Sequence, residues 1–165
     1  MKHLWSPWRL EYLTQPRTDG CIFCQAAERD DDREHLVLLR GERVFLILNR
    51  YPYNNGHLMA VPYAHVPSLE DLDTETLAEM MHLLNRGLGA LRTTMMPDGF
   101  NVGANLGSVA GAGIEEHVHL HAVPRWQGDT NFMPVVGDMR VVPQTWEQTY
   151  DLIKVALDAQ HSPEG

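Results

Sequence analysis

The run of residues 117–126 holds three histidines at alternate positions, His117, His119 and His121, separated by Val118 and Leu120. Alternation is the period of a β-strand, in which successive side chains point to opposite faces. A strand therefore turns the three histidines to one face, about 7 Å apart from one to the next, so that one extended ligand can lie along them. On a helix the same side chains would spread around the axis and share no site.

A single histidine in a strand is ordinarily a hydrogen-bonded structural residue. Three in alternation are different, because an imidazole costs free energy to bury and protonated neighbours repel one another. The row also follows a loop, residues 106–113, with glycines at 107, 111 and 113. The pattern therefore favours a functional site. Pro124 has no N–H to donate and predicts the end of the strand.

The composition narrows the class of protein. The chain of 165 residues suits one domain with a sizeable core, and 44% hydrophobic with 21% charged residues is ordinary for a globular protein. No apolar run approaches the roughly 18 residues of a membrane span, and the first residues lack a signal-peptide pattern. Two cysteines make no disulfide framework, so we expect a cytoplasmic location. The net charge of −9 disfavours a broad contact with nucleic acid but allows a small anionic ligand.

Short apolar runs bounded by turn residues predict five strands, at residues 36–39, 43–48, 57–61, 100–105 and 117–123. Leucines and methionines repeat at spacings of three and four across residues 73–96, which predicts one long amphipathic helix with Asp73 as its N-cap. Further helices are expected at residues 6–13 and 145–159. The sum is an α+β domain with a mainly antiparallel sheet of about five strands, one long helix packed on it, and helical extensions at both ends.

The motif His-x-His-x-His-x-x-Pro-Arg that ends at Arg125 resembles the signature of the histidine triad (HIT) superfamily of nucleotidyl hydrolases and transferases. The resemblance covers about residues 4–157. It is nearest to bacterial members that resemble diadenosine tetraphosphate phosphorylases and hydrolases, through the runs at residues 4–9, 49–57, 100–107 and 124–132. It implies a HIT-like fold and a single HIT domain over residues 1–165, with extensions at about 1–20 and 125–165.

A neutral imidazole can attack phosphorus, and much of an ordinary histidine is neutral at physiological pH. The resemblance implies that His119, the middle histidine, is this nucleophile, and that His121 donates a hydrogen bond or a proton near the leaving oxygen. The implied reaction cleaves a dinucleoside polyphosphate through a covalent nucleotidyl-histidine intermediate, with phosphate or water as the acceptor. Mg²⁺ is expected to accompany the polyphosphate.

The resemblance also implies substrate contacts outside the triad. Asn49 matches an asparagine that contacts the ribose, and His57 matches a histidine near the phosphates. Asn105 matches the amide residue that opens the loop before the triad. Without the resemblance, either asparagine would be read as an ordinary turn residue.

Three residues of the glycine-rich loop, Gly111, Ala112 and Gly113, are expected around the phosphates. Glycine lets the backbone approach a ligand closely, so that N–H groups can surround an anion. Phosphorylase-like members of the family carry a hydroxyl residue shortly before the triad, whereas this chain has Ala112-Gly113-Ile114. This departure leaves both phosphate and water open as acceptors.

Cys21 and Cys24 form a Cys-x-x-Cys pair, which by itself fits a zinc site, a redox pair or no function. A redox pair wants a βαβ context, which is absent, and a zinc site needs two more nitrogen or sulfur ligands. In the family members that keep this pair, the other two ligands correspond to His65 and His117. The resemblance therefore implies a structural zinc with four protein ligands and no open position for catalysis.

Other function classes remain open. One is a zinc-stabilised nucleotide-binding module with little turnover, and another is a nucleotidylyltransferase for sugar phosphates. The resemblance implies a small-molecule nucleotide substrate and a homodimer or higher homo-oligomer. The sequence does not fix the preferred base, the polyphosphate length, the number of subunits or the physiological role.

Overall fold

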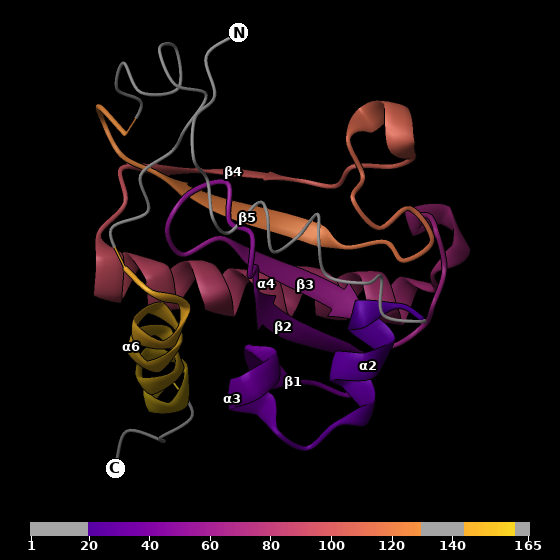
Figure 1. Cartoon of the computed structure of the whole chain (residues 1–165), viewed down its shortest axis with the longest axis horizontal. Helices are drawn as coiled ribbons and strands as arrows, with labels where there is room; N and C mark the ends of the chain where they lie inside the picture. The colour runs from indigo at the N-terminus through magenta and orange to yellow at the C-terminus, as the bar shows by residue number, and fades with distance from the viewer. Residues whose placement is uncertain (1–19, 130–143, 161–165) are drawn as a thin grey trace, which may run out of the picture.

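The computed structural model describes residues 20–129 and 144–160 (Figure 1). The expected helix at residues 6–13 lies outside the described residues. The expected helix at 145–159 is α6, Trp146–Ala159, and a capping box between Thr145 and Gln148 begins it. The division of the chain into one domain with two extensions stays a prediction.

Five strands form one antiparallel sheet in the order β1-β2-β3-β5-β4. This confirms the predicted α+β fold with a five-stranded sheet. The neighbours β2 and β3 are buried along their whole length, which shows that both faces of the sheet are covered there. The strands are β1 (Val37–Arg40), β2 (Val44–Leu48), β3 (Leu58–Pro62), β4 (Gly99–Gly103) and β5 (Leu120–Arg125).

The position of β5 corrects the prediction of a strand over residues 117–123. The strand begins only at Leu120, because the preceding chain is tied to the segment after β3, where the Val118 N–H donates to the Val66 carbonyl at 2.8 Å. It also continues past Pro124, which pairs with Phe100 on β4. Since β3 pairs with β5 only as far as Ala122, a residue without an N–H interrupts no hydrogen bond to β3 at this point.

The long helix is α4, Thr74–Met95, and it packs across β2 and β3 (Figure 1). Asp73 caps it as predicted, because its side chain accepts a hydrogen bond from the Thr76 N–H at 2.7 Å. The buried face of α4 carries the apolar repeat, with residues such as Met80, Leu84 and Leu91. This repeat therefore lies against one face of the sheet and leaves the other face for the histidines.

The remaining helices are short, apart from α6. Helix α6 packs on α4 and β1, and its Tyr150 hydroxyl donates to the Val37 carbonyl at 3.0 Å. Helix α2 carries Phe23, which is buried against the histidine face of the sheet. The short elements are α2 (Ile22–Glu28), α3 (Asp32–His35) and two 3₁₀ turns, Leu69–Asp71 and Ser108–Ala110.

Gly87 allows α4 to approach the sheet, and its replacement tests this contact. A Cβ atom at Gly87 would lie 2.8 Å from Leu58 Cδ1 and 3.0 Å from Leu46 Cδ2, and both leucines are fully buried. We expect Gly87→Val to lower the free energy of unfolding by about 1–3 kcal/mol through overpacking, measured by chemical denaturation. The matched control is Gly89→Val, which changes the same helix by the same side chain but meets only the Gln160 amide at 3.2 Å. Equal losses in both variants would show that the helix interior, and not its contact with the sheet, requires glycine.

Candidate active site and metal centre

The histidine row divides into two sites. Alternation along β5 turns Ala122 and Pro124 toward α4 and places His121 on the opposite face. The ring of His119 lies beside His121, with 4.7 Å between the two ring centroids. His117 lies in a bend before the strand and leaves this row, so that its ring packs against His65 at 5.1 Å between centroids. The prediction of three imidazoles in one row is therefore wrong for His117, because the chain bends at this residue and its ring packs against His65 instead.

The protonation of His119 is fixed by a backbone carbonyl. His119 Nδ1 lies 2.9 Å from the carbonyl oxygen of His117. A carbonyl oxygen only accepts hydrogen bonds, so Nδ1 carries the proton and Nε2 keeps its lone pair. Burial lowers the pKa of His119, which favours this neutral form. His119 therefore presents a neutral nitrogen lone pair, which is what a nucleophile at phosphorus requires.

His121 has the opposite arrangement, and His57 imposes it. The Tyr53 N–H donates to His57 Nδ1 at 3.0 Å, so His57 Nδ1 is an acceptor and the proton of the neutral ring lies on Nε2. His57 Nε2 is 2.8 Å from His121 Nδ1, which must then accept. The His121 proton consequently lies on Nε2, a buried atom without a hydrogen-bond partner among the described residues. His121 thus offers a hydrogen-bond donor beside the lone pair of His119.

The turn after β2, residues 49–57, supports this pair of histidines. The Asn49 side chain accepts from the Tyr51 N–H at 2.9 Å and donates to His57 Nδ1 at 3.2 Å. The structure thus gives Asn49 a role in holding the turn, and its contact with a ribose stays a prediction. His57 is fully buried and contacts His121, and its expected place near the phosphates stays a prediction.

Tyr53 is a site residue that the sequence reasoning missed. Its ring packs over His57 and His121, with centroids 4.7 and 5.6 Å apart, yet 46% of the residue remains exposed. Its hydroxyl receives a hydrogen bond from Asn105 Nδ2 at 3.5 Å, which joins the turn to the loop before the triad. An aromatic residue within a run of turn-forming residues is the signal that could have identified it.

The loop before the triad is exposed at its glycines. It contains the 3₁₀ turn Ser108–Ala110, and Gly107 and Gly111 have φ of +80° and +90°, which only glycine adopts readily. Gly111 and Gly113 are exposed, and Ala112 is half-buried. The structure brings Asn105 to Tyr53 at the mouth of this loop, whereas the phosphate contacts of residues 111–113 stay a prediction.

The four residues predicted to bind zinc come together. One ligand atom from each of Cys21, Cys24, His65 and His117 lies within 4.8 Å of the others. The His117 Nδ1 atom is 3.3 Å from Cys21 Sγ and 3.2 Å from His65 Nδ1, and Cys24 Sγ is 3.3 Å from His65 Nδ1. A tetrahedral zinc ion separates sulfur and nitrogen ligands by about 3.5 Å and two nitrogens by about 3.3 Å. The group therefore fits zinc in size and in donor type.

The surroundings of His117 prepare it for a metal. His117 Nε2 donates to the Pro62 carbonyl at 2.8 Å, which leaves the lone pair on Nδ1, the atom that faces the two sulfurs. Burial, and then the neighbouring Cys21 sulfur, raises the pKa of Cys24, so two close thiols need a cation to become thiolates. Phe23 packs between the two sites, 5.3 Å from the His117 ring and 4.9 Å from the His119 ring.

Comparison with known proteins agrees with this geometry. The family model described as HIT domain matches residues 31–128. A Mycobacterium tuberculosis protein named AP-4-A phosphorylase is 40% identical over 161 residues, which cover 93% of this chain and 83% of that protein. The chain therefore belongs to the HIT family, as its histidine motif indicates.

Solved structures support the same fold. A zinc-bound histidine triad family protein from Mycobacterium smegmatis has a TM-score of 0.69 and 29% identity, and the match covers 88% of this chain and 98% of that one. A uridylyltransferase structure also has a TM-score of 0.69, over 93% of this chain and 51% of that one, but at 16% identity. The second likeness shows the shared fold alone.

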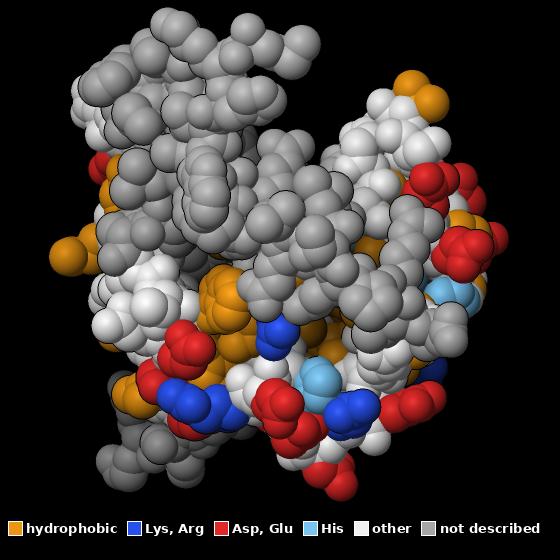
Figure 2. All heavy atoms as spheres, in the orientation of Figure 1, with side chains coloured by type: hydrophobic (Ala, Val, Ile, Leu, Met, Phe, Trp, Pro, Cys, Tyr) orange, Lys and Arg blue, Asp and Glu red, His pale blue; other side chains and the backbone are white. Residues whose placement is uncertain are grey.

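Surface charge and helix hydropathy were compared with the expected partners. On the face shown in Figure 2, the described Lys and Arg side chains lie among Asp and Glu side chains and form no basic patch. The expectation that nucleic acid is not a partner stays a prediction. Within residues 20–129 and 144–160, no helix is both long and apolar enough to cross a membrane. The homo-oligomer and the cytoplasmic location stay predictions.

The buried histidines make stability depend on pH. Burial, and then the charge of His121, lowers the pKa of His57 to about 3, and burial followed by His119 lowers that of His121 to about 4. The unfolded chain, with a histidine pKa near 6.5, binds more protons below that pH. The stability contribution is therefore complete above pH 6.5 and is lost as the pH falls toward 4.

We expect His57→Gln to flatten this dependence by up to about 1.4 kcal/mol per pH unit between pH 6 and 4. The measurement is urea unfolding of the wild type and the variant at several pH values. His82→Gln, which removes an exposed histidine on α4, is the control. The assignment fails if the His57 variant keeps the wild-type slope.

Proposed function

We propose that this chain is a nucleotidyl hydrolase or transferase that cleaves dinucleoside polyphosphates through a covalent intermediate on His119. One observation carries the proposal: the lone pair of His119 Nε2 and the proton of His121 Nε2 lie on adjacent, neutral and buried rings. The name of the M. tuberculosis relative, AP-4-A phosphorylase, supports this choice of substrate class. The two tautomers supply a nucleophile and a donor without any change of charge in the resting site.

The first step transfers a nucleoside monophosphate to the protein. His119 Nε2 attacks the α-phosphorus and forms a P–N bond, while the bond from phosphorus to the bridging oxygen of the polyphosphate breaks. His121 Nε2 donates a hydrogen bond to the departing oxygen, on which negative charge develops. His119 Nδ1 keeps its proton, and the His117 carbonyl stabilises the positive charge that the substituted ring acquires.

The second step returns the ring to its resting state. An acceptor oxygen attacks the same phosphorus, the P–N bond breaks, and the lone pair returns to His119 Nε2. If the acceptor is inorganic phosphate, diadenosine tetraphosphate gives ATP and ADP; if it is water, the products are ATP and AMP. Neutral imidazoles do not balance the charge of the polyphosphate, so we expect Mg²⁺ to accompany the substrate.

Two molecules can accept the nucleotidyl group in the second step, inorganic phosphate and water. Phosphate is favoured by the relative at 40% identity. Water is favoured by Ala112-Gly113, because neither residue has a hydroxyl group at the position where phosphorylase-like members carry one. The experiment incubates the protein with diadenosine tetraphosphate and Mg²⁺, with and without phosphate, and separates the products. ADP that forms only with phosphate establishes a phosphorylase, and AMP in both conditions establishes a hydrolase.

Replacement of the nucleophile separates an enzyme from a binding module. We expect His119→Gln to reduce turnover by more than about 1,000-fold, because both steps pass through this nitrogen, while nucleotide binding measured by calorimetry is retained. His82→Gln again serves as the control. Wild-type protein that binds nucleotide but neither turns it over nor becomes nucleotidylated at His119 contradicts the proposal and favours the binding module.

We also propose that Cys21, Cys24, His65 and His117 hold one structural zinc ion. When bound, the ion joins the first turn of α2 to the segment that carries His119, since His117 supplies both a ligand and the carbonyl that orients His119. Four protein ligands leave no open position, so the ion takes no part in the reaction itself.

Metal content and melting temperature test the zinc site. We expect one zinc per chain by elemental analysis. Cys24→Ser and His65→Gln should each lose most of the metal and lower the melting temperature, because metal binding contributes directly to folding. His35→Gln, which removes a histidine outside the group, should keep the full metal content. Full zinc occupancy in both ligand variants would exclude this site.

A further inference from the structure

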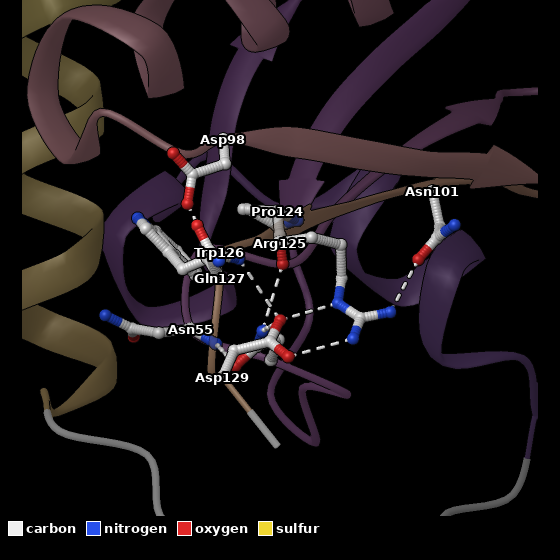
Figure 3. Close-up of polar contacts among 9 residues, drawn as sticks. Asn55, Asp98, Asn101, Pro124, Arg125, Trp126, Gln127 and Asp129 are labelled. Atoms are coloured by element: carbon white, nitrogen blue, oxygen red, sulfur yellow. Dashed lines mark hydrogen bonds and ion pairs between the residues drawn. The ribbon is translucent and has the colours of Figure 1, made fainter.

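A polar network lies at the end of β5 (Figure 3). Its centre is the carboxylate of Asp129, whose side chain is 10% exposed. Arg125 donates to it twice, from Nε at 2.6 Å and from Nη2 at 2.9 Å, and the Trp126 N–H donates at 3.2 Å. Arg125 also donates to Asn101 on β4 at 2.9 Å. The network therefore fixes the turn after β5 to the neighbouring strand.

Asn54 connects this network to the turn that carries His57. Its Nδ2 donates both to Asp129 Oδ2 at 2.9 Å and to the Pro124 carbonyl at 3.0 Å. Its Oδ1 accepts from the Asn55 N–H at 3.1 Å, and its carbonyl accepts from the His57 N–H at 3.2 Å. Asn54 directly follows Tyr53, the residue whose N–H donates to His57 Nδ1.

The hydrogen bond between His57 and His121 does not choose a direction by itself. If His57 Nδ1 were protonated, His57 Nε2 would accept from His121 Nδ1, and His121 Nε2 would carry a lone pair and could no longer donate. Two donors of the turn exclude this arrangement, the Tyr53 N–H at 3.0 Å and the Asn49 amide at 3.2 Å. The position of the turn thus decides which nitrogen of His121 holds the proton.

We propose that Asp129 is a positioning residue that, through Asn54, holds the Tyr53 N–H against His57 and thereby keeps the His121 proton on Nε2. Asp129 touches neither histidine and has no part in bond making. The kinetic consequence rests on the proposed function, whereas the tautomer of His121 does not. An ion pair that only stabilised the surface would leave that tautomer unchanged.

The chain provides a matched control for this proposal. Lys154 and Asp158 on α6 form another ion pair with the same spacing of four residues and the same 2.6 Å distance between nitrogen and oxygen. Asp158 lies far from the histidines in the sequence, and its pair is on an exposed helix face. Both variants remove the carboxylate of an ion pair with this spacing, but Asp158 is exposed and bound to one Lys, whereas Asp129 is largely buried and is bound twice by Arg125. Only Asp129→Ala removes the support of Asn54.

The experiment combines kinetics with ¹⁵N NMR of histidine side chains, which reports the protonated nitrogen of each ring. We expect Asp129→Ala to lower kcat about 10-fold, with KM little changed, and to shift His121 toward the Nδ1-protonated form in the absence of substrate. Asp158→Ala should change neither quantity. If Asp129→Ala does not fold, Asp129→Leu, which nearly keeps the size of the side chain but offers no acceptor to Asn54, takes its place.

A swap of the two side chains tests direct coupling. Asn54→Asp sets two carboxylates against each other and should shift the His121 tautomer as Asp129→Ala does. The double variant Asn54→Asp/Asp129→Asn restores one amide–carboxylate hydrogen bond and should recover most of the lost kcat.

The outcomes separate this inference from the proposed function. An unchanged His121 tautomer in both Asp129→Ala and Asn54→Asp overturns the inference, whatever happens to activity. A wild-type His121 that is protonated on Nδ1 overturns it as well. If the wild type turns over no dinucleotide, the proposed function fails, and the NMR comparison still decides the role of Asp129.

Discussion

The carbonyl oxygen of His117 accepts a hydrogen bond from His119 Nδ1, and the chemistry of the site depends on this bond. A carbonyl cannot donate, so the ring of His119 has no choice of tautomer while the two residues keep their places. The Tyr53 N–H acts in the converse way on His57, because a backbone N–H cannot accept. Two backbone groups with fixed roles thus create a lone pair and a donor on neighbouring imidazoles.

The residue that supplies this carbonyl, His117, also belongs to the candidate zinc site. His117 is held by its ring, through Pro62 and the facing cysteines, and it is held by its backbone, through His119. The bend before β5 makes this possible, because it turns the His117 ring away from the strand face that His119 and His121 share. Phe23 packs against both the His117 ring and the His119 ring and so separates the two sites. Under the proposed function, a metal-binding histidine and the nucleophile therefore lie two residues apart without sharing a ligand.

Much of the architecture follows from local patterns. The helix over residues 73–96 and the five strands were predictable, because apolar spacing and caps such as Asp73 act over a few residues. The bounds of β5 were not, since they depend on a hydrogen bond to Val66 and on where β3 begins. Tyr53 escaped prediction because its contact with His121 joins segments 68 positions apart in the sequence.

The sequence by itself determined which chemical groups are available: the imidazoles, the two thiols, and their family-like spacing around a glycine-rich loop. Only the tertiary structure decided what each group does. A histidine has two nitrogens of nearly equal basicity, and the partner that each nitrogen meets selects the tautomer. For His121 that partner is His57, 64 residues away, and for His117 it is a proline carbonyl 55 residues away. Local spacing cannot specify such partners, because they meet only when the sheet has formed.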